Sequence, residues 1–343
     1  MKLVYFILKR KVNMIQNTMN SSELAVERAT AQNRMSFQRH KKTLILLSMV
    51  LPGAIWLLLL RYLPMFGIVM AFQNWEIYYD NPTLFSNIIH SPWVGLQNFA
   101  FLFATSDCWQ MLFNTIAYNL VFIILGTIIS VAFAIMMSEL TLRRLMKTYQ
   151  TMMFFPFFLS WVVASYFLYA FLAPDDGLMV HLFKNLEITQ LGWYNDTRPW
   201  PYLIVFAHMW KNVGYTVVLY MAAIVGIDSS LFEAARIDGA SKWQQIRYVT
   251  LPHLTTLIVV LLIINVGKIF SSDFGLFYTV PMNSGPLIPV TQVVDTYVYR
   301  ALLNTGDVGM STAAGLFQSA VGFVLVLITN AIVRKVEPDS AMF

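Results

Sequence analysis

The chain has 343 residues, of which 57% are hydrophobic and only 12% are charged, whereas an average soluble domain carries about 25% charged residues. This composition predicts an integral membrane protein and excludes an ordinary soluble domain. The formal net charge of +5 comes from basic residues placed beside apolar stretches, so it indicates membrane topology and is a poor sign of nucleic-acid binding.

The apolar stretches predict an all-α membrane domain. Residues 1–41 are interpreted as a polar cytoplasmic arm, because the apolar run at their start is too short for a secretory signal. We expect residues 42–336 to form one transmembrane domain and residues 337–343 a cytoplasmic tail. Prolines at positions 52, 64 and 156 predict that the first and third spans are kinked. The six predicted spans, each long enough for a hydrocarbon core of about 30 Å, are 43–66, 111–138, 149–173, 201–225, 254–275 and 311–333.

The distribution of basic residues predicts the orientation. Most of the 23 Lys and Arg residues fall in the arm, in 139–148, in 226–253 and at the C-terminal end. This asymmetry predicts that these segments and both termini are cytoplasmic. We expect short helices in the outer segment before about residue 108 and one more at about 177–186. Cys108 is the only cysteine, so the chain has no internal disulfide and no thiolate metal cluster.

A charged island at 226–253 separates the fourth and fifth spans. Ser230 with Glu233, and Ser241 with Gln244, have capping-box spacing, so each pair predicts the start of a short helix. Gly239 between them suits the left-handed conformation that ends a helix.

Pro252 is expected to stop the second helix or to tilt its exit toward the next span. The island is therefore predicted to be a helix, a tight turn and a second helix. Two explanations of it stay open: an amphipathic loop packed on its own bundle, or a surface that another protein approaches closely over the small residues Ala234, Ala235 and Gly239.

The spacing of the island resembles a known motif. Glu233-Ala234-Ala235, three residues, Gly239, nine residues, Val249, one residue and Leu251-Pro252 resembles the EAA motif of binding-protein-dependent ABC importer permeases, with valine in place of isoleucine. From about residue 43 nearly the whole chain is similar to the carbohydrate permeases typified by the LplB proteins, within the maltose- and glycerol-phosphate-type inner-membrane components. RYLPMFGIVMAFQNW, SPWVGLQNFAFLF and AAGLFQSAVGFVLVLITN are among the similar stretches.

The resemblance implies a type I ABC importer permease fold with six kinked spans and a cytoplasmic coupling-helix loop between spans 4 and 5. It implies a heterodimer with a second related six-span permease, two cytoplasmic ABC ATPase subunits and an extracellular solute-binding lipoprotein, all at a bacterial cell membrane. Glu233 would be either the polar partner at the ATPase surface or a helix cap. The implied ATPase-coupling residues are Glu233, Ala234, Ala235, Asp238, Gly239, Ala240, Leu251 and Pro252.

This chain is not expected to be an enzyme or to bind a cofactor itself. It has no P-loop, since Gly267-Lys268 is followed by Ile269 and lacks the preceding glycine. ATP and Mg²⁺ are therefore assigned to the partner ATPases. The implied function is ATP-driven import of an oligosaccharide or polysaccharide-degradation fragment by alternating access. Its rivals are a gradient-driven secondary sugar transporter and a membrane enzyme acting on a lipid-linked sugar.

Polar residues inside the fourth and fifth spans are candidates for the substrate path, because such groups usually face the bundle interior. Helical spacing gathers them on one face of each span, where they would meet sugar hydroxyls while Trp210 and Tyr215 stack on the sugar ring. The structural alternatives are a salt bridge of Asp273 with Lys211 or Lys268, and snorkelling of Lys211 to the outer surface. The candidates are His208, Lys211, Asn212, Tyr215, Asn265, Lys268, Ser272 and Asp273.

Overall fold

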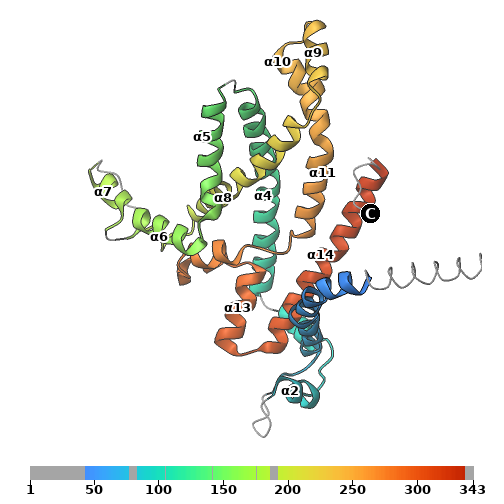
Figure 1. Cartoon of the computed structure of the whole chain (residues 1–343). Coiled ribbons are helices and arrows are strands. Elements are labelled where there is room, and N and C mark those ends of the chain that lie inside the picture. Colours follow the sequence, from blue (N-terminus) through green and yellow to red (C-terminus); the bar gives the residue numbers. More distant parts are fainter. Residues whose placement is uncertain are drawn as a thin grey trace, which may run out of the picture. The chain divides into compact units, whose positions relative to one another are not determined.

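The computed structural model describes residues 43–76, 83–104, 106–140, 142–174, 176–185 and 192–336. The predicted arm and tail, 1–41 and 337–343, lie outside the described residues. The described part is helical and holds no β-strand beyond one isolated antiparallel bridge between Gln73 and Trp93 (Figure 1). Among these residues, four helices are long and apolar enough to cross a membrane, or up to six if each of two bent helix pairs is one span.

The chain divides into two compact units after Gly67. In the first unit, residues 43–57 form an α-helix that contains Pro52. The helix then changes to a π turn, η1 (Leu58–Tyr62), and to a 3-10 helix, η2 (Leu63–Phe72), which holds Pro64. The predicted interruption of the first span therefore lies at Pro64 and not at Pro52.

The second unit is built around two long helices, α4 (Ser106–Ser138) and α8 (Trp200–Val225), which pack along each other. Helix α11 (Leu251–Gly267) packs on α14 (Val308–Val336), which also contacts α13 (Val294–Thr305). The shorter helices include α2 (Leu84–His90), α3 (Gln97–Ala104), α7 (Leu178–Asn185), η6 (Gly285–Leu287) and α12 (Ile288–Thr291).

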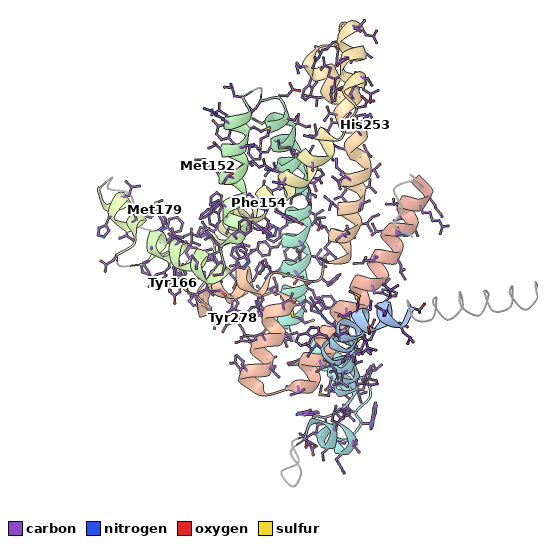
Figure 2. The ribbon with its side chains drawn as sticks, in the orientation of Figure 1. Met152, Phe154, Tyr166, Met179, His253 and Tyr278 are labelled. Carbon is purple, nitrogen blue, oxygen red and sulfur yellow. The ribbon has the colours of Figure 1, made fainter. Side chains whose placement is uncertain are left out.

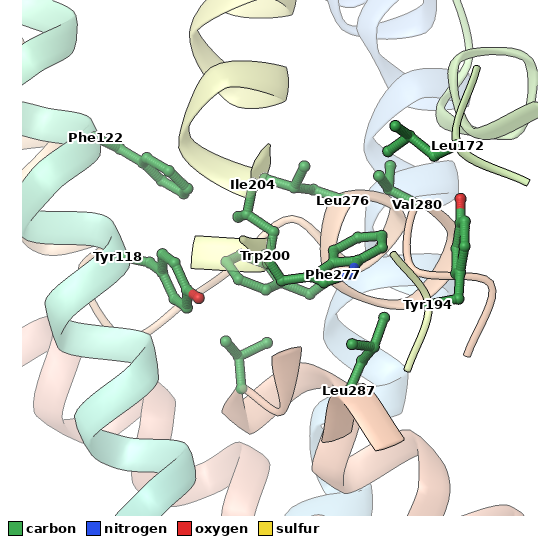
Figure 3. Close-up of a cluster of buried hydrophobic side chains, with 11 residues drawn as sticks. Tyr118, Phe122, Leu172, Tyr194, Trp200, Ile204, Leu276, Phe277, Val280 and Leu287 are labelled. Atoms are coloured by element: carbon green, nitrogen blue, oxygen red, sulfur yellow. The ribbon is translucent and has the colours of Figure 1, made fainter. Parts of the chain in front are cut away.

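Large apolar side chains fix these helices to one another. One buried cluster joins the start of α8 to the segment that follows α11, with Trp200 and Phe277 fully buried at its centre (Figure 3). A second cluster joins α4, α8 and the start of α11 through Met137, Tyr220 and Leu254. Burial of such side chains supplies most of the packing energy between helices, at about 1.5–3 kcal/mol for each fully buried one.

The third predicted span, 149–173, is broken and not merely kinked. Helix α5 (Arg143–Phe154) passes through a 3-10 turn, η3 (Phe155–Phe158), into α6 (Trp161–Leu172), and the two helical parts are bent by 100°. Figure 2 shows Phe154, at the end of α5, and Tyr166 on α6. Pro156 lacks the N–H that would continue α5, and Ser160 starts α6 by accepting from the Val163 N–H.

The fifth predicted span, 254–275, ends earlier than expected. Helix α11 stops at Gly267, and its last carbonyls, those of Asn265 and Val266, accept from the Lys268 N–H. The chain then leaves the helix, and Asp295 on α13 accepts the N–H of Ser272 at 2.7 Å. Helical structure resumes only at a π turn, η5 (Gly275–Thr279).

Pro252 does not stop the second helix of the charged island. Helix α10 (Lys242–Gln245), a π turn η4 (Ile246–Thr250) and α11 form one continuous helix, Lys242–Gly267. A proline inside an α-helix clashes with the carbonyl four residues back. The π turn directly before Pro252 replaces that geometry with a wider bond from the Leu251 N–H to the Ile246 carbonyl.

Candidate functional site

The charged island forms two helices, as its caps predict, but the first begins elsewhere. Helix α9 (Ser229–Ile237) is capped by Asp228, whose Oδ1 accepts from the Ser230 N–H at 2.9 Å. This hydrogen bond lowers the pKa of the Asp228 carboxyl. The predicted box of Ser230 with Glu233 is therefore wrong, because the aspartate two residues upstream, a strong N-cap residue, starts the helix first.

The turn between the two helices has the geometry that its glycine predicts. Gly239 has φ +76, and the hydrogen bonds from the Gly239 N–H to Arg236 and from the Ala240 N–H to Ala235 form a Schellman motif. Ser241 then caps α10 in a full capping box with Gln244. The two helices thus meet at a tight, fully hydrogen-bonded corner.

The α9–α10 pair presents its motif residues outward. None of the α9 residues is buried, and Ile237 is 86% exposed. Glu233 is exposed and its carboxylate has no hydrogen bond or ion pair with the described residues. Lys242 and Glu139 form an ion pair of 2.6 Å that ties α10 to the end of α4, although such an exposed pair contributes only about 0–1 kcal/mol. This exposed face does not pack on its own bundle.

A cavity of about 440 Å³ lies between α4, α8 and the end of α11. Six of the eight predicted substrate-path residues line it: His208, Asn212, Tyr215, Asn265, Lys268 and Asp273. The cavity wall is mainly amides, hydroxyls and aromatic rings. Its size lies within the range of about 300–1,000 Å³ that is common for small-molecule sites.

The two remaining candidates face other neighbours. Lys211 is buried and donates to the main-chain carbonyls of Phe157 (2.9 Å), Pro156 (3.5 Å) and Leu159, which lie at the break after α5. The Pro156 carbonyl also accepts from the Leu159 N–H. Ser272 is also buried, and its Oγ accepts from the Asn119 side chain at 3.2 Å. Both residues therefore form hydrogen bonds that connect the segments around the cavity.

Ring stacking shapes the wall formed by α8. His208 stacks on Phe122 with ring centroids 3.8 Å apart and an interplanar angle of 3°. Tyr215 stacks on Phe157 from the broken span, with centroids 4.8 Å apart. Trp210, which was expected to stack on the sugar, lies outside this cavity against apolar residues on another side of α8.

No described ion pair joins Asp273 to either lysine. The Asp273 carboxylate instead accepts from Trp161 Nε1 and from the Gly275 N–H. Snorkelling of Lys211 to the outer surface is likewise not observed, since its ammonium is held by carbonyls inside the bundle.

Helix α4 contributes a wall of the cavity that was not among the predicted substrate-path residues. Asn119, Phe122, Thr127 and Ser130 line the cavity, and the polar members recur at helical spacing along an otherwise apolar stretch. That spacing was a usable signal in the second span, as it was in the fourth and fifth.

A polar cavity enclosed by membrane-length helices, joined to an exposed charged helix pair, defines a transport protein of the membrane. Residues 123–338 match the family described as the binding-protein-dependent transport system inner membrane component. The chain belongs to this family and is a permease subunit of an ABC transporter, which excludes the gradient-driven carrier. The family is one of transport permeases.

Named relatives cover almost the whole chain. It is 31% identical to the polygalacturonan/rhamnogalacturonan transport system permease protein YteP of Bacillus subtilis, over 91% of this chain and 97% of the relative. It is 29% identical to Protein LplB of the same organism, over 89% of this chain and 92% of LplB. A chain in a crystal structure of a bacterial ABC transporter that imports the acidic polysaccharide alginate superposes with a TM-score of 0.78 at 28% identity, covering 88% of this chain and 99% of that chain.

Proposed function

We propose that this chain is the transmembrane subunit of an ATP-driven importer that moves an oligosaccharide or a polysaccharide-degradation fragment by alternating access. The continuous helix Lys242–Gly267 carries the proposal. It begins at the capping box of the charged helix pair, and Asn265 near its other end lines the cavity. A displacement of the α9–α10 pair would therefore be transmitted to the cavity wall through one continuous helix.

A carbohydrate substrate fits both the cavity and the relatives. Sugar hydroxyls need donors and acceptors, which Asn212, Asn265 and Thr216 offer, while the apolar face of a sugar ring packs against an aromatic ring such as that of Tyr215. The transport of polygalacturonan/rhamnogalacturonan by one relative and of alginate by another supports an oligosaccharide over a small ion.

The exposed face of α9 and α10 is proposed as the coupling surface for a cytoplasmic ABC ATPase. Glu233 would be its polar contact, since Asp228 already fills the role of cap. The small side chains of Ala234, Ala235 and Ala240 would let the ATPase approach the backbone closely, and Gly239 with Asp238 forms the turn between the two helices. Leu251 and Pro252 lie where the π turn passes into α11, so they would fix the direction in which the movement travels.

The remaining parts of the importer are proposed from the family. They are a second six-span permease that forms a heterodimer with this chain, two ATPase subunits that bind ATP and Mg²⁺, and an extracellular solute-binding lipoprotein. A structural relative is a bacterial alginate ABC transporter in complex with an alginate pentasaccharide-bound periplasmic protein, which supports the last of these. In this arrangement both termini and the charged island are cytoplasmic, and six spans cross the membrane.

Alternating access then follows from the rigidity of the connection. Closure of the ATPases on ATP would move the α9–α10 pair as one body, and α11 would carry its cavity residues with it. Loaded binding protein would deliver the sugar while the cavity faces outward. Hydrolysis would separate the ATPases and turn the cavity inward.

The test compares two glycines that are equally strained and equally free of neighbours. Gly239 has φ +76 and Gly306 has φ +67, and an added Cβ meets nothing within 4 Å at either position. We expect Gly239→Trp to abolish copurification of the ATPase and ATP-dependent uptake in membrane vesicles, because a large ring projects from the coupling corner. Gly306→Trp, which adds the same ring at the end of α13, should retain both.

Wild-type protein coexpressed with the products of neighbouring genes should bring down an ATPase and a second permease, and uptake should stop when ATP is omitted. Retention of the ATPase by Gly239→Trp at wild-type level would remove the coupling role from this corner. Sugar uptake that continues without ATP would overturn the proposed function itself.

A further inference from the structure

The ionic groups on the cavity wall differ in whether they already have partners. Asp273 accepts two hydrogen bonds, from Trp161 Nε1 and from the Gly275 N–H. His208 is stacked on Phe122, and Asn212 lies beside its ring. Lys268 is exposed to the cavity, and its ammonium makes no hydrogen bond or ion pair with the described residues. It is therefore a positive charge on this wall that the described chain leaves unpaired.

A second free donor lies close to Lys268. Asn265 precedes it by one helical turn at the end of α11, lines the same cavity and is exposed. Its side-chain amide has no partner among the described residues, although its main-chain carbonyl accepts from the Lys268 N–H. Residues three apart on a helix are neighbours, so the ammonium and the amide together offer several N–H donors to one small acceptor group.

We infer that Lys268, with Asn265, binds the carboxylate of a uronic acid residue, so that the importer carries an acidic oligosaccharide. This inference rests on the proposed function and specifies its substrate. Charged groups kept on the cavity wall of a membrane protein usually serve a ligand or an ion. A carboxylate supplies the missing charge and at the same time accepts from the neighbouring amide.

The place of Lys268 favours a carboxylate over a phosphate. Lys268 follows the last residue of α11, and the C-terminal end of a helix carries a partial negative charge of about half an elementary charge. That end stabilises a lysine but repels an anion, and it repels a doubly charged phosphate more than a singly charged carboxylate. Phosphate groups are commonly bound at the opposite end of a helix.

The rest of the cavity suits the neutral part of an acidic sugar. The Ser130 hydroxyl is buried in the wall without a hydrogen-bond partner, and a buried hydroxyl left unpaired costs about 1–3 kcal/mol. Tyr215, supported by the ring of Phe157, offers an apolar face. One sugar unit can thus meet charge, hydroxyl and ring within one cavity.

The experiment measures binding to the purified complex of both permeases and the ATPases, without the binding protein, by titration calorimetry. The probes are a tri-uronate oligosaccharide, its carboxyl-reduced neutral counterpart and a phosphorylated trisaccharide. Lys268→Met removes the charge at nearly the same length, Lys268→Arg keeps it, and Lys335→Met is a matched control, because Lys335 is an exposed lysine in the last turn of α14.

We expect wild type to bind the tri-uronate more tightly than the other two probes. Lys268→Met should weaken that binding about 10- to 100-fold, the loss of one hydrogen bond to a charged group, and leave the neutral probe unchanged. Lys268→Arg and Lys335→Met should bind like wild type. Added salt should weaken binding of the tri-uronate by wild type and not by Lys268→Met.

Other outcomes distinguish failure of the uronate inference from failure of the proposed importer function. Preference for the neutral or the phosphorylated probe, or equal loss of all probes in Lys268→Met, overturns the uronate assignment and leaves a sugar importer. Failure of the wild-type complex to bind any of the three probes, together with no ATP-dependent uptake of them, counts against both proposals.

Discussion

Lys211 and Lys268 differ in whether the described chain gives their ammonium groups partners. Lys211 is buried and points into the break between α5 and α6, where it donates to three carbonyls. Lys268 has no partner among the described residues. The ring of Trp161 lies 5.3 Å from the Lys211 ammonium, which adds a cation–π contact. Lys211 therefore connects α8 to the broken span through these hydrogen bonds.

Lys211→Met should destabilise the protein, because it leaves the carbonyls of Phe157 and Leu159 without the ammonium that donates to them. One hydrogen bond to a charged group is worth about 1.5–3 kcal/mol, so we expect a fall of several degrees in the melting temperature measured in detergent. Lys268→Met serves as the control and should melt like wild type. Equal melting temperatures for all three proteins would mean that Lys211 does not hold the break.

At this scale the sequence predicted faces but not partners. Helical spacing correctly gathered His208, Asn212 and Tyr215 on the side of α8 that lines the cavity. It did not separate Lys211 from Asn212, which are about 100° apart around a helix. The partners of Lys211 lie more than 50 residues away along the chain, and they became available only because Pro156 breaks a span whose path the sequence does not specify.

At the scale of elements, three of the prolines in the described residues follow the same kind of turn. Each π turn in the described part of the chain ends two residues before a proline: η1 before Pro64, η4 before Pro252 and η5 before Pro281. In each, the residue before the proline bonds to the carbonyl five residues back, which moves aside the carbonyl that the ring would meet. A proline at these three places therefore follows a wide turn, whereas Pro52 lies inside an α-helix and Pro156 lies at the break of the third span.

Close approach of α8 to α5 depends on a single glycine. A Cβ at Gly214 would lie 1.8 Å from the Met153 carbonyl oxygen and 2.9 Å from the Phe154 nitrogen, both of which are backbone atoms that cannot swing away. We expect Gly214→Ala to push α5 from α8 and to lower the yield of folded, monodisperse protein severely in size-exclusion chromatography.

Gly126→Ala is the matched control, since this glycine also lies in a membrane-length helix and its Cβ would meet only the flexible Met209 side chain at 3.9 Å. It should purify like wild type. A normal elution profile for Gly214→Ala would show that the two elements can separate without cost.

Local signals predicted the charged helix pair well and the broken spans poorly. Capping chemistry acts within one turn, so the Ser241 box and the Gly239 corner could be read from adjacent residues. The start of α9 was missed because two candidate caps compete there and Asp228 comes first. The 100° bend after α5 depends on tertiary contacts of α8, which no local pattern contains.

At the scale of the whole molecule, the proposed mechanism requires that the charged island and the loop before α8 lie on opposite sides of the membrane. Helix α8 joins them, running from Trp200 to Val225. The positive-inside rule predicts that the island is cytoplasmic. Coupling to a cytoplasmic ATPase fails if this orientation is reversed, whatever the local geometry of the α9–α10 pair.

The lone native cysteine makes the orientation directly measurable, because Cys108 is fully buried and should give little background with a membrane-impermeant thiol reagent. Glu233 and Asn195 are both exposed. We expect Glu233→Cys to react in inside-out vesicles and not in intact cells, and Asn195→Cys to show the reverse. Wild type, with Cys108 alone, is the control for both. Reaction of the two variants from the same side would mean that α8 does not cross the membrane, and the coupling of α9–α10 to a cytoplasmic ATPase would lose its physical basis.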